Sequence, residues 1–264
     1  MKPLPHIVVI LLVIVTAVFG LIEPDAYAGF MSPLHHQESR GQDAISLFVA
    51  IPLLMIGLAG AARAPRRWAL FSGASYGYLL YVYLLYALGG VMNPGFPAYL
   101  AVAALSLRGL LRVLRLRDQD GPTRSSVRPR TLVFVAVVFL VFALTLTVLW
   151  GAILLQALRD AVPPDALIII VFDFTAVIPA YIAVSSRLLS GSLRGNLEAG
   201  ILALFSAVLG ASILTGQLFA MAHGQHAGFG AVLYFAGFTV LSLLAFALLR
   251  HRSSFGPGAE SASR

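Results

Sequence analysis

The stretch TLVFVAVVFLVFALTLTVLWGAILLQA, residues 131–157, contains 27 consecutive residues without a charged side chain. An α-helix needs about 20 apolar residues to cross the ~30 Å hydrocarbon core of a bilayer, so this stretch is long enough to span a membrane. A helix that is apolar on every side has no polar face to offer to water. The stretch therefore predicts a membrane-spanning helix.

Seven other stretches, of 18 to 25 residues, are also largely apolar and long enough to span a membrane. The mean hydropathy of the chain is +0.89, and 18 basic plus 11 acidic residues are too few to cover a soluble protein of 264 residues. No stretch alternates like a strand of an outer-membrane barrel. We therefore expect an all-α integral membrane protein with about eight transmembrane helices, the others lying at residues 5–22, 41–62, 67–88, 95–114, 166–189, 197–221 and 228–249.

The arginines predict the orientation. Basic residues collect on the cytoplasmic side of membrane proteins. With the N-terminus in the cytoplasm, only Arg40 and Arg159 fall outside, and the other sixteen of the 18 basic residues fall inside. We therefore expect both termini in the cytoplasm. The inner residues are Lys2, Arg63, Arg66, Arg67, Arg108, Arg112, Arg115, Arg117, Arg124, Arg128, Arg130, Arg187, Arg194, Arg250, Arg252 and Arg264.

The N-terminus allows a second interpretation. Lys2, the apolar run after it and Ala26-Tyr27-Ala28 also fit a signal peptide with a small-residue cleavage site. Cleavage would leave seven helices with the same outer face. An uncleaved first helix is simpler, because an even number of spans already returns both termini to the cytoplasm.

The polar stretch LHHQESRGQD, residues 34–43, lies in the expected outer loop between the first two spans. Ser39 and Gln42 have the spacing of a capping box at a helix start. Asp43 would then lie in the first turn, at the positive end of the helix dipole. We expect these three residues to begin the second span.

Five outer residues form a candidate site for a divalent metal. Neutral imidazoles bind zinc, copper or nickel, and a carboxylate can complete the ligand set. The alternative is a polar loop that faces water or lipid headgroups. The candidate ligands are His35, His36, Glu38, His223 and His226.

Asp173 is the candidate polar centre inside the membrane. It lies about eight residues into the sixth span, where a carboxylate is costly and should face the protein interior. Pro179 should kink this helix, and Thr175 can satisfy backbone groups that the proline frees. A kinked helix with a buried acid fits a cation pathway, and it equally fits a carboxyl group that locks helix packing. Tyr83 and Tyr86, which share one face of the third span with Tyr76, are candidate partners, and Gln217 is a weaker candidate polar residue.

The chain divides into two possible four-helix halves, at 1–117 and 131–250. Gly-Phe follows the third and the seventh spans, and Ile-Pro follows an aspartate in the second and the sixth. Such halves would be parallel repeats. Residues 118–130 would form an Arg-rich cytoplasmic linker, and residues 251–264 a disordered tail. Gly210 and Gly216 would let the seventh span approach its neighbours closely.

Several function classes find no support in the sequence. There is no cysteine, no phosphate loop, no Gly-x-Ser-x-Gly elbow and no zinc-protease helix. The basic residues flank apolar spans, so the bilayer and not nucleic acid explains them. No catalytic residue is nominated. The leading hypothesis is transport or sensing of a small solute or cation, and the alternative is a non-transporting membrane module, either an assembly partner or a metal binder.

Three stretches resemble uncharacterised multi-pass inner-membrane proteins of bacteria. They are GQDAISLFVAIPLLMIGLA, YGYLLYVYLLYALGGVMNPGFPAYLAVAALSL and FDFTAVIPAYIAV, within the chain from about residue 40 onward. The resemblance implies a bacterial cytoplasmic membrane. It brings no functional residues with it.

Overall fold

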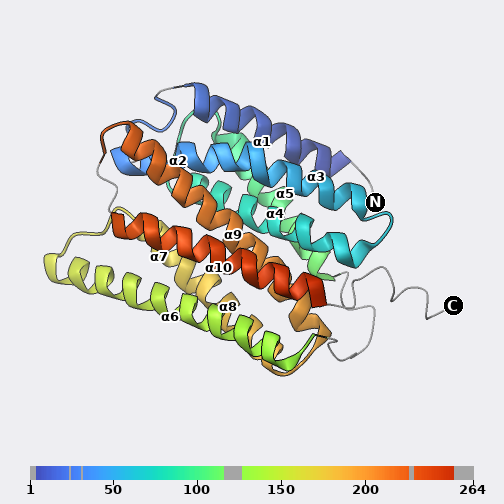
Figure 1. Ribbon diagram of the computed structural model, residues 1–264. Helices are drawn as coiled ribbons and strands as arrows, with labels where there is room; N and C mark the ends of the chain where they lie inside the picture. Colours follow the sequence, from blue (N-terminus) through green and yellow to red (C-terminus); the bar gives the residue numbers. More distant parts are fainter. Residues whose placement is uncertain (1–3, 24, 31, 116–126, 226–228, 253–264) are drawn as a thin grey trace. The chain divides into compact units, whose positions relative to one another are not determined.

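The computed structural model describes residues 4–23, 25–30, 32–115, 127–225 and 229–252. All of its elements are helices (Figure 1). Most of the predicted linker and nearly all of the predicted tail fall outside the described residues. The chain forms two compact units: one contains Met1–Gln119 with Ala203–Leu243, the other Asp120–Leu202 with Leu244–Arg264. The division into two sequential four-helix halves stays a prediction.

The first unit contains five helices from the N-terminal part of the chain. Helix α1 packs on α2 and α5, and α4 packs on α3 and α5 (Figure 1). A short π-helical segment, η1, joins α2 to α3 without a break. The bounds are α1 Leu4–Ile22, α2 Pro33–Ile45, η1 Ser46–Ala50, α3 Ile51–Gly60, α4 Pro65–Leu88 and α5 Phe96–Arg115.

The second unit is built on α6 and α8, which pack against each other. Helices α9 and α10 each contribute residues to both units. The bounds are α6 Pro129–Asp160, α7 Leu167–Phe172, η2 Asp173–Val177, α8 Ile178–Leu189, α9 Leu193–Ala222 and α10 Phe229–Arg252.

Seven helices of the described chain are long and apolar enough to cross a membrane. They correspond to seven of the eight expected spans and indicate a multi-pass membrane protein. The eighth, α4, is 24 residues long but is not among them. Its five tyrosines lower its mean hydropathy, so the count of eight stays a prediction.

The exposed surface of α6 is also typical of a membrane-spanning helix. Val133, Val137, Leu144 and Val148 recur at helical spacing and are 49–64% exposed. A soluble monomer rarely exposes so long an apolar stripe, whereas lipid tails cover one at no cost. At about 1.5 Å per residue, the 32 residues of α6 measure about 48 Å, more than the hydrocarbon core requires.

The second span begins earlier than the sequence analysis expects. Ser32 is the N-cap and accepts a hydrogen bond from the backbone of His35, and Pro33 occupies the first turn. The expected capping box at Ser39 is therefore wrong, because Ser39 lies inside α2 and is buried. Serine followed by proline is itself a strong helix-start signal. The polar stretch 34–43 is consequently helical and not a loop.

Two π-helical segments interrupt the helices, and each directly precedes Ile-Pro. In η1 the amide of Ile51 donates to the carbonyl of Ser46, and in η2 the amide of Ile178 donates to Asp173. A proline cannot donate to the residue four positions earlier, and its ring crowds that carbonyl. A wide turn just before the proline relieves this crowding. The irregularity expected at Pro179 is thus a π-bulge.

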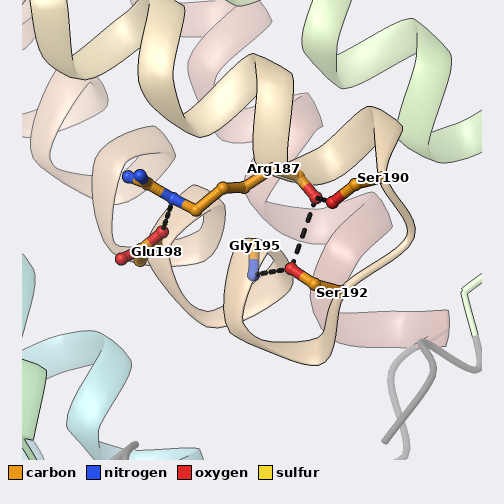
Figure 2. A network of polar contacts seen from close by, with 5 residues as sticks. All are labelled: Arg187, Ser190, Ser192, Gly195 and Glu198. Atoms are coloured by element: carbon orange, nitrogen blue, oxygen red, sulfur yellow. Dashed lines mark hydrogen bonds and ion pairs between the residues drawn. The ribbon is translucent and has the colours of Figure 1, made fainter. Parts of the chain in front are cut away.

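A network of polar contacts fixes the turn between α8 and α9 (Figure 2). Ser192 accepts a hydrogen bond from the Gly195 amide at 3.0 Å and donates to the Arg187 carbonyl at 3.3 Å. Ser190 donates to the same carbonyl at 2.8 Å. The Arg187 side chain also forms an ion pair with Glu198, on the first turns of α9. Side chains of the turn therefore satisfy one backbone carbonyl at the end of α8 and one backbone amide at the start of α9.

Within the first unit, α2 and α9 approach at backbone distance. A Cβ atom on Gly41 would lie 2.2 Å from the amide nitrogen of Gly216, and a Cβ atom on Gly216 would lie 2.6 Å from the Cα atom of Glu38. Only glycine fits at either position. The close approach predicted for Gly216 is confirmed.

We predict that Gly216→Ala lowers the free energy of unfolding by about 1–3 kcal/mol, because α2 must move away from the added methyl group. Thermal unfolding of the detergent-purified protein measures the loss. Gly237→Ala is the control, since a Cβ atom on Gly237 has no neighbour within 4 Å. Equal stability of the two variants would show that the helices are not in contact at Gly216.

Candidate functional site

Asp43 is the most enclosed carboxylate of the first unit. It lies ten residues after Pro33, about 15 Å along the helix from the start of α2, and is 0% exposed. A buried carboxylate needs hydrogen bonds or an opposite charge to offset its lost hydration. Its neighbours therefore determine what it can do.

Two tyrosines donate hydrogen bonds to Asp43, one to each oxygen. The hydroxyl of Tyr27, in the turn before α2, lies 2.5 Å from Oδ2. The hydroxyl of Tyr86, on α4, lies 3.4 Å from Oδ1 and 3.0 Å from the carbonyl of Ser39. The carboxylate thus links the turn, α2 and α4.

Gly20 makes room for the carboxylate on α1. A Cβ atom at this position would lie 2.0 Å from Oδ2 of Asp43 and 2.5 Å from the Tyr27 hydroxyl. Any larger residue would therefore displace the pair. Three helices and a turn meet at one side chain.

Further tyrosines surround this centre. The Tyr86 ring lies 5.3 Å from those of Tyr27 and Tyr99, and Tyr83 lies 5.7 Å from Tyr86. Such offset and edge contacts between rings are favourable. Asn93 fixes the nearby turn, because its amide donates to the Ala26 carbonyl at 2.8 Å and to the Tyr99 hydroxyl at 3.0 Å.

The donors to Asp43 are neutral. Burial, and then the charge of Asp43, raise the pKa of Tyr27 well above its usual value, so this phenol keeps its proton. Arg40, one turn earlier on α2, donates to the Leu21 carbonyl at 2.9 Å and lies 5.9 Å from the Phe219 ring centre, and its positive charge still attracts Asp43 through space. Among the described residues, no basic side chain forms an ion pair with Asp43. The centre therefore has the chemistry to take up a proton or a small cation.

A second carboxylate, Glu38, lies nearer the start of α2. It accepts a hydrogen bond from Gln217 of α9 at 2.6 Å, and its other oxygen lies 3.7 Å from Nε2 of His35. Members of the two predicted sites meet here: Gln217 belongs to the predicted intramembrane site, and His35 and Glu38 belong to the predicted metal site. The side chains of His35 and Glu38 are 24% and 19% exposed, so the pair is close to the surface.

The remaining metal candidates lie apart from a common centre as far as they are described. His36 contacts the Tyr27 ring edge-on at 6.0 Å. Nδ1 of the exposed His223 lies 2.8 Å from the Phe219 carbonyl of its own helix. His226 is outside the described residues. Within the described chain no three histidine, aspartate or glutamate side chains are grouped as metal ligands, and the metal site stays a prediction.

Asp173 opens the π-helical segment η2 of the second unit and is 4% exposed. The indole of Trp150, on α6, donates to its Oδ2 at 2.8 Å. Thr175 is exposed, and its hydroxyl donates to the Val171 carbonyl at 2.7 Å, one turn earlier. The predicted intramembrane set is thus divided: Asp173 and Thr175 lie in the second unit, and Tyr83, Tyr86 and Gln217 in the first.

Sequence reasoning missed three members of the Asp43 centre. In the sequence, Tyr27 stands out only as part of a possible cleavage site, Gly20 has no distinguishing pattern, and Asp43 has the spacing of a helix start. The Ser32-Pro33 signal would have placed Asp43 three turns into the helix, where a charge needs an explanation. The contact with Gly20 has no signal in a single sequence.

Comparisons of the chain with protein families, curated proteins and solved structures find no match. Functional inference therefore depends on the geometry of the chain itself.

We predict that Tyr27→Phe destabilises the protein by about 1.5–3 kcal/mol, the usual range for a hydrogen bond to a charged group. A double-mutant cycle with Asp43→Asn, followed by thermal unfolding, measures the coupling between the two side chains. The cost of Tyr27→Phe should fall by at least about half in the Asn background. An unchanged cost would mean that Tyr27 stabilises the fold through ring packing alone.

Proposed function

We propose that this is a protein of a bacterial cytoplasmic membrane, with both termini in the cytoplasm, that moves or senses a small cation bound at Asp43. The membrane assignment is supported by the seven apolar helices. The orientation is supported by the distribution of basic residues along the sequence. The cation site is supported by the chemistry around Asp43.

The observation that carries the proposal is a fully buried carboxylate held by neutral hydroxyl groups. A carboxylate without an ion-pair partner is expensive at this depth even when it is hydrogen-bonded, so a proton or small cation that neutralises it gains binding free energy. The two donors to Asp43 bring further oxygens to the carboxylate: their own phenol hydroxyls and the Ser39 carbonyl that Tyr86 also contacts. Oxygen is the ligand that hard cations prefer.

A second candidate function is a non-transporting membrane module. One observation favours it: both oxygens of Asp43 already accept hydrogen bonds from the chain itself. In that case the carboxylate is a permanent link between helices and binds nothing else. The two functions differ in how Asp43→Asn responds to cations.

We predict that the thermal stability of the purified protein depends on the concentration of one cation, tested separately with protons, Na⁺ and K⁺. A cation that binds only the folded state raises its stability by about 2.7 kcal/mol at 100 times the dissociation constant. Asp43→Asn should remove this dependence. Asp25→Asn, an exposed aspartate in the turn before α2, is the control and should keep it.

The wild type could instead show no cation dependence, and Asp43→Asn could be less stable by the same amount at every cation concentration. That result would support the second candidate function, a non-transporting membrane module. Retained dependence in Asp43→Asn would move the cation site away from Asp43.

A further inference from the structure

We infer that α2 is a gate over Asp43, which bends at η1 and so opens the centre to the outer side of the membrane. The inference rests on the proposed function and adds the moving element through which a cation enters and leaves. A movement is required, because Asp43 is 0% exposed and an enclosed site exchanges its ligand only when part of the structure opens. The gate is Pro33–Ile45, and its hinge is η1, Ser46–Ala50, together with Pro52.

The hinge lies directly after the residue that binds the cation. It begins at Ser46, three positions after Asp43. The amide of Ile51 donates to Ser46 and Pro52 has no amide, so neither of these residues supplies a helical donor to the Leu47 carbonyl. Kinks in helices concentrate at prolines and at π-bulges. A bend at this level therefore has no helical hydrogen bond to break at Leu47.

The two sides of the hinge pack on different helices. After the hinge, α3 packs on α4, which in turn packs on α5. Before the hinge, α2 packs on α1. The part of the span below the hinge can therefore stay fixed on α4 while the part that carries Asp43 moves.

Hydrogen bonds from two other helices hold the gate closed. Gln217 of α9 donates to Glu38 at 2.6 Å, and Tyr86 of α4 donates to the Ser39 carbonyl at 3.0 Å. We call the bond between Glu38 and Gln217 the latch. The Glu38 side chain is 19% exposed, so water reaches the latch. A hydrogen bond to protein can be exchanged for one to water, and its net contribution to the closed state is modest.

The backbone contact beside the latch is also one that can separate. A Cβ atom on Gly41 would lie 2.2 Å from the amide nitrogen of Gly216, so the two helices touch through their backbones. Neither glycine has a side chain that interlocks with the opposite helix. The helices can therefore part and close again at this point without a change of side-chain rotamer.

The charge on Asp43 biases the gate, because Asp43 is itself part of α2. When the gate is closed, the carboxylate is enclosed by Gly20, Tyr27 and Tyr86. A charged carboxylate is better solvated by water, whereas a neutralised one loses less on burial. A bound cation therefore favours the closed gate and an empty site favours the open gate, which is the shift of populations that a carrier or a sensor requires.

The experiment uses the absence of cysteine from the chain, since a single introduced thiol then reports its own exposure to water. Ser39→Cys places the thiol on the gate, where Ser39 is 3% exposed. Val91→Cys is the control, because Val91 is 0% exposed and follows α4 at the same end of the unit, where Asn93 contacts the Ala26 carbonyl before α2.

The measurement is the rate at which the detergent-purified full chain reacts with a charged, water-soluble thiol reagent. Each rate is divided by the rate of Val91→Cys under the same conditions. We expect Ser39→Cys to react at least tenfold faster than this control. Adding Gln217→Ala, which removes the latch, should raise the rate roughly tenfold or more, the factor that corresponds to one hydrogen bond to a charged group. Saturation with Na⁺, K⁺ or protons, whichever stabilises the wild type, should lower the rate at least tenfold.

A disulfide in place of the latch tests the same movement without a reagent. A Cβ atom on Gly216, the residue before Gln217, would lie 2.6 Å from the Cα atom of Glu38, so Glu38→Cys combined with Gln217→Cys brings two thiols close together. Oxidation before the cation is added should remove the response of thermal stability to that cation, and reduction should restore it. Each single variant, treated in the same way, should respond as the wild type does.

A full cation response of the oxidised double variant, or equal reaction rates of Ser39→Cys and Val91→Cys, would overturn the gate and leave the proposed function standing. A stability that responds to no cation through Asp43 would overturn the proposed function, whether or not α2 opens.

Discussion

The burial of the Asp43 carboxylate is the constraint on which the first unit depends. A negative charge removed from water has to be hydrogen-bonded or neutralised, and here two phenols meet that need from different parts of the chain. Their convergence fixes the turn before α2 against α4. It also requires α1 to carry glycine at position 20, because the carboxylate occupies the space of a side chain. One polar group thus determines how four segments come together.

Each of the two units contains a buried aspartate that needs hydrogen-bond donors, and the donors differ between the units. Both contain a π-bulge before Ile-Pro, and both contain a buried aspartate in the interrupted helix. In the first unit the aspartate lies before the bulge and meets tyrosines. In the second it opens the bulge and meets the indole of Trp150. Aligning the two Ile-Pro pairs matches Asp173 with Ser46 rather than with Asp43, so any repeat preserves the backbone irregularity and not the carboxylate.

The apolar spans could be predicted because each reflects local composition, and all eight expected stretches are helical. The periodicity of α4 also predicted that Tyr76, Tyr83 and Tyr86 share a face. Their partners could not be predicted, since contacts between α1, α2 and α4 depend on packing across long sequence separations. The position of Asp43 differs from the prediction for a local reason: the spacing of a capping box at Ser39 accounts for its charge, whereas the helix begins at the stronger signal Ser32-Pro33.

The tyrosines of α4 also bear on biogenesis. This helix is not among the seven that are apolar enough to cross a membrane, and it brings five phenol groups that need hydrogen-bond partners. Hydroxyls of α4 pair with His6 and Thr16 of α1 and with Ser39 and Asp43 of α2. Those partners precede α4 in the chain and are already synthesised when it emerges. The order of translation therefore makes a hydrogen-bond partner available to Tyr76, Tyr83 and Tyr86 before α4 is complete.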